Sequence, residues 1–474
     1  MDYKKIGFMC GLEIHQELSG KKLFCSCLTD MKEEGLELEI KRKLRATAGE
    51  IGETDVAAEF EQLRDRNFIY HGYKNEYCLV DADCEPPHEI NKEALNIALT
   101  ICKVLKLNIP DSLVVMRKII TDGSACSSFQ RTILCGLESN ESFIKTSKGE
   151  VKITSLCLEE DACKIEKTDG KDVYYSLSRQ GIPLIEIRTD PDVKDAEHAK
   201  ETAEKIGLIL RSFPIKRGIG TIRQDVNLSV KNGVRVEVKG FQDLRSMPKV
   251  IESEVKRQLD LIDKSELKAE VRKANADGTT SFLRPLPGAS RMYPDTDFYE
   301  ILITKEQLEA LKLPELTTEK IVRLEKEYNL SSQLAREIIK RNINLERYVK
   351  SYNKVRPDLI GYILIEIPKE IKRRYNLDIK KIKDKDYDLV LSLLDKGEIE
   401  KGAVIEILVE VAQGKKVDIS KYKRADLNEL EKEVRLVVEK NKGLSINALM
   451  GIIMKDYKGK IDGKEVMKIL KKLM

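Results

Sequence analysis

The sequence lacks long apolar runs. None approaches the roughly 20 consecutive apolar residues that a bilayer-spanning helix needs, so no membrane segment is expected. The first ten residues, MDYKKIGFMC, contain neither a long apolar region nor a small-residue cleavage site, and we therefore expect no secretory signal. The ten cysteines are scattered along the chain, which suits a reducing, cytoplasmic compartment better than a disulfide scaffold.

Several familiar catalytic motifs are also missing. There is no Walker loop and no GxGxxG sequence, so an ATP site in this chain would not be of a common type. The Cys, His and Ser positions form no recognisable nucleophile arrangement, and there is no amidase or asparaginase signature. What the chain does have is 41% hydrophobic and 35% charged residues with a net charge of +4, which is typical of a soluble globular protein.

With 474 residues the chain is too long for one ordinary core, and roughly two to four domains are expected. Strand-like alternation in GLEIH, RQDVNLSV and VRVEVKG is interspersed with helical periodicity up to about residue 290. Residues 284–297 hold three prolines and a glycine, which predicts a loop that closes this part. Helical patterns dominate afterwards. We predict a mixed catalytic-sized domain over residues 1–294, a helical domain over 295–400 and a small helical tail over 401–474.

The predicted tail is basic. Residues 401–474 contain 17 Lys and Arg against 11 Asp and Glu, while the rest of the chain is slightly acidic. A basic end on a near-neutral body fits a nucleic-acid contact. A solvated lysine-rich helical surface explains the same charge pattern, and charge alone favours that simpler interpretation.

Glu13 and His15, in the stretch CGLEIHQEL, are two residues apart. In a strand, residues at this spacing share a face, so the acid and the imidazole would point one way and Leu12 and Ile14 the other. A strand that presents one of only four histidines beside a carboxylate is a candidate metal-site wall.

Four further segments place acids beside polar or basic groups. They are LCLEEDACK with Glu160, SRQGIPLIEIRTDPD with Arg179 and Glu186, RQDVNLSV with Asp225, and VRVEVKG with Glu237. Glu186 is the most informative, because it interrupts an apolar run in which a lone carboxylate would cost several kcal/mol unless paired or bound to a metal. Oxygen ligands of this kind suit Mg²⁺ and phosphoryl transfer. Ordinary surface acids in Arg–Glu pairs are the alternative for any single segment.

Cys25 and Cys27 form a CxC pair that could be half of a zinc site. The other half would need a second close pair, and none follows within the usual spacing. The sequence therefore does not decide whether these two cysteines bind zinc.

Taken together, GLEIHQEL with KLFCSC, LEEDACK, LSRQGIPLIEI, RQDVNLSV and EVKGFQDL resemble, in order, the GatB/GatE family. GatE belongs to the archaeal glutamyl-tRNA(Gln) amidotransferase, and GatB is its bacterial relative. The segments RKLRATAGE and VMRKIITDGSACSSFQRT favour GatE. Unlike the usual GatE, this chain has no room after Ile262 for the insertion domain related to one in bacterial aspartyl-tRNA synthetases.

The resemblance implies an α+β fold, with a large mixed antiparallel-sheet cradle domain, a helical domain and a YqeY-like, tRNA-binding tail. It implies an ATP- and Mg²⁺-dependent enzyme that phosphorylates the glutamyl side chain of Glu-tRNA(Gln) and amidates it with ammonia. The ammonia would come from a separate asparaginase-like glutaminase partner, GatD. The implied metal ligands, the first four of them also catalytic, are Glu13, His15, Glu160, Glu186 and Glu237.

Two further residues are candidates for binding the nucleotide: Asp225, from a segment that matches the family, and Arg179, from its chemistry alone. Two other functions remain open from the sequence. One is a bacterial-type GatB that acts on Asp-tRNA(Asn) as well as Glu-tRNA(Gln). The other is a tRNA-binding scaffold whose acids are structural.

Overall fold

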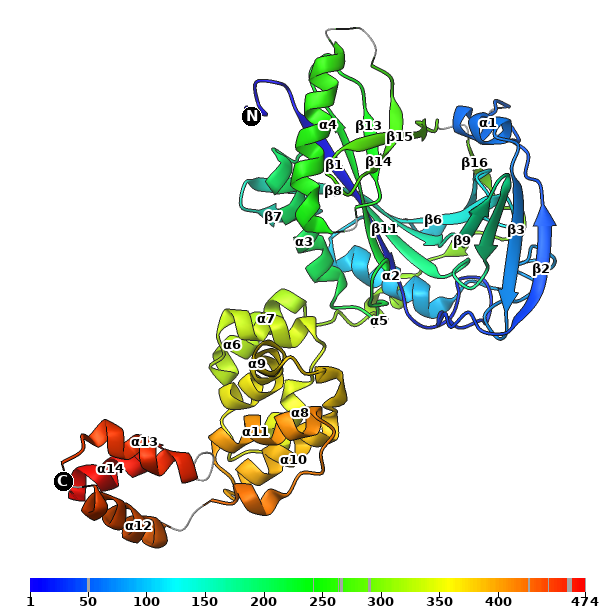
Figure 1. Ribbon diagram of the computed structural model, residues 1–474. Coiled ribbons are helices and arrows are strands. Elements are labelled where there is room, and N and C mark those ends of the chain that lie inside the picture. The colour runs from blue at the N-terminus through cyan, green and yellow to red at the C-terminus, as the bar shows by residue number, and fades with distance from the viewer. Residues whose placement is uncertain are drawn as a thin grey trace. The chain divides into compact units, whose positions relative to one another are not determined.

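A computed structural model describes residues 1–474 except 49–51, 242, 263, 265–266, 289–290, 425–426, 442, 458–462 and 474. Contacts divide the chain into two units, residues 1–316 and 317–474. The first unit mixes strands and helices and the second is helical, which confirms the predicted α+β class (Figure 1).

An eleven-stranded sheet forms the framework of the first unit. Its strand order is β15-β14-β13-β12-β1-β11-β8-β6-β5-β16, with β7 paired to β8. Neighbouring strands are antiparallel except β13 and β14. The strands are β1 (Met9–Glu17), β5 (Val115–Ile119), β6 (Phe129–Leu137), β7 (Phe143–Thr146), β8 (Gly149–Glu160), β11 (Pro183–Thr189), β12 (Ile222–Ser229), β13 (Val236–Lys239), β14 (Glu270–Ala274), β15 (Thr280–Pro285) and β16 (Met292–Pro294).

Two smaller sheets complete the strands of this unit. One has the order β2-β3-β10-β9 and the other pairs β17 with β4. Their strands are β2 (Leu36–Arg42), β3 (Asn67–Tyr73), β4 (Ser112–Leu113), β9 (Lys164–Asp169), β10 (Asp172–Ser176) and β17 (Ile301–Leu302). The helices of the unit are α1 (Val56–Leu63), α2 (Lys92–Val104), α3 (Ala196–Leu210), α4 (Met247–Ile262) and α5 (Lys305–Ala310), with a 3₁₀ turn, η1 (Leu244–Ser246).

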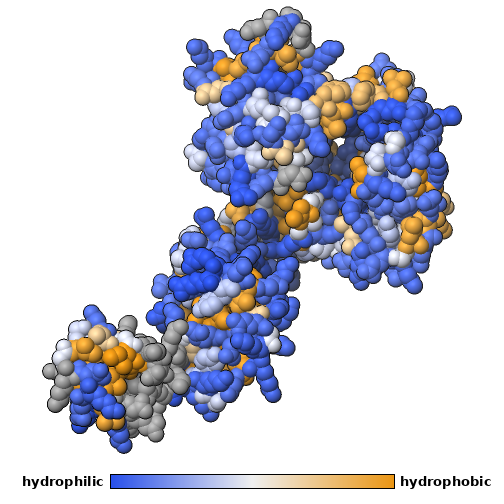
Figure 2. Space-filling model, in the orientation of Figure 1, coloured by the Kyte–Doolittle hydropathy of each residue, from blue (hydrophilic) through white to orange (hydrophobic). Residues whose placement is uncertain are grey.

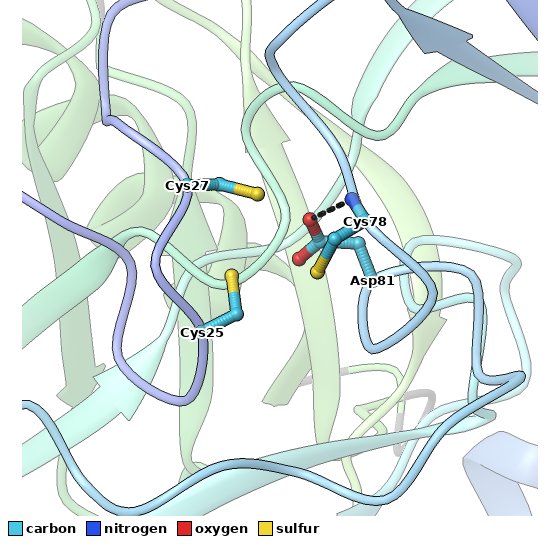
Figure 3. A group of neighbouring side chains, drawn as sticks. All are labelled: Cys25, Cys27, Cys78 and Asp81. Atoms are coloured by element: carbon cyan, nitrogen blue, oxygen red, sulfur yellow. Dashed lines mark hydrogen bonds between the residues drawn. The ribbon is translucent and has the colours of Figure 1, made fainter.

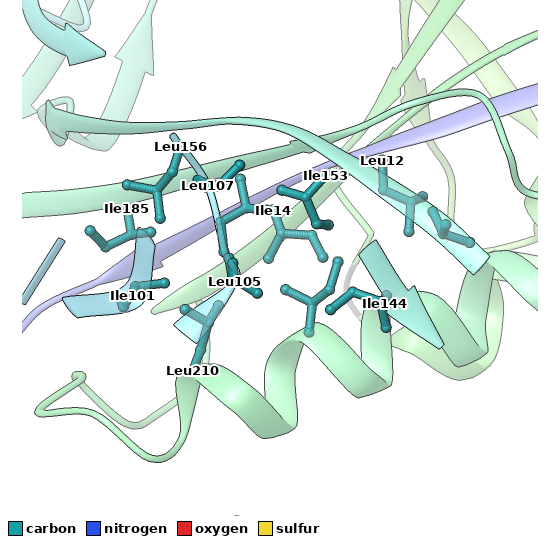
Figure 4. Close-up of a cluster of buried hydrophobic side chains, with 14 of the residues drawn as sticks. Leu12, Ile14, Ile101, Leu105, Leu107, Ile144, Ile153, Leu156, Ile185 and Leu210 are labelled. Atoms are coloured by element: carbon teal, nitrogen blue, oxygen red, sulfur yellow. The ribbon is translucent and has the colours of Figure 1, made fainter. Parts of the chain in front are cut away.

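The main core lies on one face of the large sheet. Leu12 and Ile14 of β1 and Ile185 of β11 are buried there with side chains of α2 and α3, among them Leu210 (Figure 4). The helical stripe that the sequence shows over residues 196–210 is the buried face of α3, and the predicted N-cap Asp195 accepts a hydrogen bond from the His198 amide at 2.9 Å. Successive side chains of a strand point to opposite faces of the sheet. Because Leu12 and Ile14 point to the core face, Glu13 and His15 point to the opposite face.

The predicted closing loop differs in part from the structure. Thr280–Pro285 and Met292–Pro294 are strands, and the latter pairs with β5 from Lys118 to Met116. Pro285 and Pro294 are tolerated because each is the last residue of its strand, and β16, which contains Pro294, is an edge strand of the sheet.

The second unit contains two hydrophobic clusters. One gathers α6 (Thr317–Tyr328), α7 (Ser332–Lys340), α8 (Leu345–Ser351), α9 (Pro357–Tyr375), α10 (Asp384–Asp395) and α11 (Lys401–Ala412), with the 3₁₀ turns η3 (Ile379–Lys381) and η4 (Ile419–Tyr422). The other joins α12 (Leu427–Lys440), α13 (Ile446–Tyr457) and α14 (Gly463–Leu473). The expected tail boundary at residue 401 stays a prediction, but α11 packs in the first of these clusters through Val404 and Ile407.

Hydrophilic side chains dominate the visible surface in Figure 2. Among the described residues, none of the helices is both long enough and apolar enough to span a bilayer.

Candidate active site

A cavity of about 650 Å³ opens on the face of the large sheet opposite the main core. Strands β1, β5, β8, β11, β12 and β13 contribute polar side chains to its lining, and α1 and β15 add further residues. Five of the seven residues predicted for the site line it, namely Glu13, His15, Glu186, Asp225 and Glu237.

The register of β1 with its two neighbours brings these side chains together. His15 lies opposite Glu186 on β11, and Glu13 lies opposite Asp225 on β12. Directly opposed residues of antiparallel strands point to the same face. The His15 Nε2 and Glu186 Oε2 atoms are 3.0 Å apart, and His15 Nδ1 lies 3.9 Å from an Asp225 oxygen. The prediction that Glu13 and His15 share a face is therefore confirmed.

Glu186 is buried, as the apolar run around it predicts. Burial raises the pKa of this carboxyl, but the hydrogen bond with His15 and the positive charges of Lys118 and Arg188 outweigh burial and lower it. Its Oε1 atom lies 2.7 Å from Arg188 Nε, yet without hydrogen-bond alignment. Among the described residues, this buried oxygen has no aligned hydrogen-bond donor, and the Arg188 guanidinium is the cation beside it.

Further carboxylates add negative charge around Glu13. Burial, followed by the charges of Glu186 and Glu237, raises the pKa of Glu13. Burial lowers the pKa of His15, but the hydrogen bond and charge of Glu186 reverse this and raise it. Negative charge that raises the pKa of Glu13 in this way also favours a bound cation.

Glu160, also predicted as a metal ligand, lies outside the lining of this cavity. Its carboxylate accepts a hydrogen bond from the Arg131 amide at 3.2 Å and pairs with the Arg131 guanidinium at 3.5 Å. The preceding residue, Glu159, lines the cavity instead and lies with His15 and Glu186, their ligand atoms all within 4.8 Å. Successive strand residues point to opposite faces, so Glu159 and Glu160 point to opposite sides of β8 and only Glu159 faces the cavity.

Arg179 is also placed away from the cavity lining. Its guanidinium donates to the carbonyl oxygens of Ala162 at 2.7 Å and Cys163 at 2.8 Å. A side chain held in this way braces the chain beyond β8 rather than facing a nucleotide, so its predicted phosphate contact is not supported. Asp225 does face the cavity, where it accepts a hydrogen bond from Lys239 at 2.7 Å.

Basic residues stand between the acids. Lys118 contacts Glu159 at 2.7 Å, Arg188 contacts Glu186, and Lys239 contacts Glu237 at 2.6 Å. Arg188 and Lys239 each follow an identified acid by two positions, so strand alternation places them on the same face as that acid. Sequence reasoning did not single out Arg188.

The donor set fits Mg²⁺. Glu13, His15 and Asp225 form one group of candidate ligands and His15, Glu159 and Glu186 another, with ligand atoms within 4.8 Å in each. Carboxylate oxygens, the hard ligands that Mg²⁺ prefers, predominate in both groups. Among the described residues, one buried Glu186 oxygen also has no aligned hydrogen-bond donor. Glu237 belongs to neither group, and its carboxylate contacts Lys239 at 2.6 Å.

A second candidate metal cluster lies apart from this cavity. Cys25, Cys27, Cys78 and Asp81 have ligand atoms within 4.8 Å of one another (Figure 3). Three thiols and one carboxylate suit Zn²⁺. Cys78 does not belong to a second cysteine pair, because the fourth member of the cluster is Asp81. Asp81 also accepts a hydrogen bond from the buried Lys22 ammonium at 2.9 Å.

The fold and the site define the class: an enzyme whose α+β catalytic unit is followed by helical domains. Residues 8–309 match the GatB/GatE catalytic domain, and residues 344–474 match the GatB domain. The chain belongs to the GatB/GatE family.

Similar proteins include three that are named as the E-type subunit of a glutamyl-tRNA(Gln) amidotransferase. The one from Methanocaldococcus jannaschii is 35% identical over 627 positions, covering 100% of this chain and 99% of that protein. The one from Archaeoglobus fulgidus is 34% identical over 618 positions, covering 100% and 99%. That from Methanosarcina barkeri is 33% identical, covering 99% and 98%.

These alignments confirm the resemblance to GatE. They also extend well beyond the 474 residues of this chain, so the relatives carry long segments with no counterpart here. The difference agrees with the expectation that this chain lacks an insertion domain.

Proposed function

We propose that this chain is the ATP- and Mg²⁺-dependent subunit of a tRNA-dependent amidotransferase that converts Glu-tRNA(Gln) to Gln-tRNA(Gln). The similar proteins carry this amidotransferase name, and the catalytic-domain match covers the cavity. The observation that carries the proposal is the convergence of Glu13, His15, Glu159 and Glu186 on one wall of that cavity.

The reaction has two steps. A γ-carboxylate oxygen of the tRNA-bound glutamate attacks the γ-phosphorus of ATP, giving an acyl phosphate and ADP. Ammonia then attacks the acyl carbon, phosphate leaves, and the amide remains after loss of a proton. Mg²⁺, when bound, neutralises charge on the phosphoryl oxygens. Glu13, His15, Glu159, Glu186 and Asp225 would hold it, with Glu237 beside them.

The chain's own residues set the charge of the cavity. The bond with Glu186 fixes the orientation of the His15 ring. Lys118 and Arg188 hold Glu159 and Glu186 in place and lower the local negative charge, which would otherwise repel both ATP and the glutamyl carboxylate. These cations position the acids.

The ammonia source and the tRNA contact are assigned outside the cavity. We propose that an asparaginase-like glutaminase partner supplies ammonia, since this sequence shows no amidase signature. The helical cluster of α12–α14 is the proposed tRNA-binding tail. Ten free cysteines agree with a cytoplasmic location.

ATP hydrolysis by the full chain with the glutaminase partner and Mg²⁺ tests the proposal. We expect turnover with Glu-tRNA(Gln) and little with uncharged tRNA(Gln) or Gln-tRNA(Gln). A chain that binds Glu-tRNA(Gln) without consuming ATP would be a scaffold, and comparable turnover with Asp-tRNA(Asn) would favour the bacterial-type activity.

A further inference from the structure

Most cations of the cavity already neutralise a carboxylate. Lys118, Arg188, Arg223 and Lys239 lie within 2.8 Å of acidic oxygens of Glu159, Glu186, Asp161 and Asp225 respectively. These four side chains therefore contribute little free positive charge to an incoming anion.

Three arginines in the same lining are different. Arg235 precedes β13, Arg284 lies on β15, and Arg291 precedes β16. Within the described part of the chain, their side chains enter no ion pair and no hydrogen bond. Burial, together with the charge of Arg284, lowers the pKa of Arg291. The neighbouring guanidinium groups of Arg284 and Arg291 repel one another, and an anion between them would relieve that repulsion.

A second cavity of about 310 Å³ locates that anion more narrowly. It shares Lys118, Glu159, Arg188, Arg235 and Arg291 with the larger cavity, so these residues stand where the two meet. The smaller cavity is lined by four cations and one carboxylate, whereas the acids Glu13, Asp225 and Glu237 line only the larger one. The site is therefore acidic on one side and basic on the other.

We propose that Arg235 and Arg291 bind the phosphate chain of the nucleoside triphosphate, with Arg284 adding positive charge from the larger cavity. The inference rests on the proposed function and adds the residues that bind its nucleotide. Mg²⁺ in proteins is held by few carboxylates together with substrate phosphates, so the phosphates belong where the cationic wall meets the candidate metal ligands. That boundary is formed by Arg235, Arg291 and Glu159. A tRNA phosphate is the competing occupant and has no such need to adjoin the metal.

Calorimetric titration of the full chain with Mg²⁺ and a non-hydrolysable ATP analogue tests this assignment, with AMP as the second ligand. Arg235→Gln and Arg291→Gln should each weaken analogue binding by about 10- to 100-fold, the usual effect of losing a charge-assisted contact. AMP binding should change little, because AMP lacks the β- and γ-phosphates. Arg291→Lys should restore part of the affinity, since it keeps the charge but not the guanidinium fork.

Arg245→Gln is the matched control. Arg245 lies in the same unit, pairs with Asp243 and is 85% exposed. Its loss should leave both affinities unchanged. Because Arg235 is itself exposed, its variant should fold normally even if Arg291→Gln does not.

The outcomes separate the two proposals. If the wild-type chain does not bind the analogue, the proposed function fails and this inference with it. If the wild type binds and both glutamine variants bind equally well, only the arginine assignment is overturned. A raised KM for Glu-tRNA(Gln) with unchanged analogue affinity would also overturn it, since the arginines would then contact tRNA.

Discussion

Replacing Glu186 with glutamine tests the centre of the proposed site. The change removes one negative charge but keeps an oxygen that can accept from His15, which lies 3.0 Å away. Losing one electrostatic contact of a preorganised site typically lowers kcat by about 10²- to 10³-fold. We expect at least that loss in tRNA-dependent ATP hydrolysis.

The cost to folding should be moderate. Glu186 is the main partner of Arg188, but Arg188 also lies 3.7 Å from Glu13 and its side chain is 45% exposed. Water and Glu13 can therefore compensate the guanidinium in part, and we expect a loss of about 1–3 kcal/mol in the free energy of unfolding. Urea unfolding measures this loss.

Glu254→Gln is the control for a buried, arginine-paired glutamate outside the cavity. Its side chain is fully buried and contacts Arg257 at 2.7 Å and Arg272 at 3.4 Å. It should destabilise the chain at least as much as Glu186→Gln while sparing ATP hydrolysis. Glu186→Gln should leave tRNA affinity unchanged in a filter-binding assay. Wild-type ATP turnover in the Glu186 variant would refute its assignment.

Four other expectations follow from particular contacts. Glu159→Gln should reduce tRNA-dependent ATP turnover by about 10²-fold, whereas Glu160→Gln should mainly lower the thermal unfolding midpoint, and equal kinetic losses would contradict the strand register. The three-thiol cluster predicts about one zinc per chain in protein purified without chelators, as measured by metal analysis. Cys78→Ser should remove most of this zinc, and equal zinc in both proteins would exclude Cys78 as a ligand. Burial lowers the pKa of His198 below 6.5, so the unfolded chain binds the proton more strongly, and stability should fall as pH drops through and below about 6.5. Urea unfolding at pH 7.5 and 5.5 should show a smaller decrease for His198→Asn, and an identical decrease would contradict a neutral His198. Deleting residues 427–474 spares the core that contains α11 and should raise the KM for tRNA with little change in kcat; an unchanged KM would contradict a tRNA-binding tail.

Much of the candidate site could be predicted because strand alternation is a local property. Glu13 and His15 could be assigned to one face from the apolar Leu12 and Ile14 between and beside them. Glu186 could be identified because a carboxylate in an apolar run needs a partner, and the structure supplies His15 and Arg188.

The remaining residues depend on information that is not local. In LEEDACK, three successive acids leave the parity of the strand undecided, and only pairing with β6 and β11 assigns Glu159 to the cavity. Arg179 has the right chemistry, but its nearest acceptors are the carbonyls of Ala162 and Cys163. Cys78 is 51 positions from Cys27 and is brought beside it by folding.

The same limitation applies to the larger elements. The helices of the second unit and the stripe on α3 follow from periodicity, whereas β16 was assigned to a loop because its proline and short length conceal the pairing with β5. Arg291 went unnoticed in that segment for the same reason.

An oxygen-transfer experiment tests the central claim most directly. Glu-tRNA(Gln) labelled with ¹⁸O in the γ-carboxylate is allowed to react once with excess full chain, Mg²⁺, ATP and ammonium, and the released phosphate is analysed by mass spectrometry. If the cavity phosphorylates the carboxylate, the phosphate gains one ¹⁸O for each glutaminyl-tRNA formed. Amide formation with unlabelled phosphate would contradict the account.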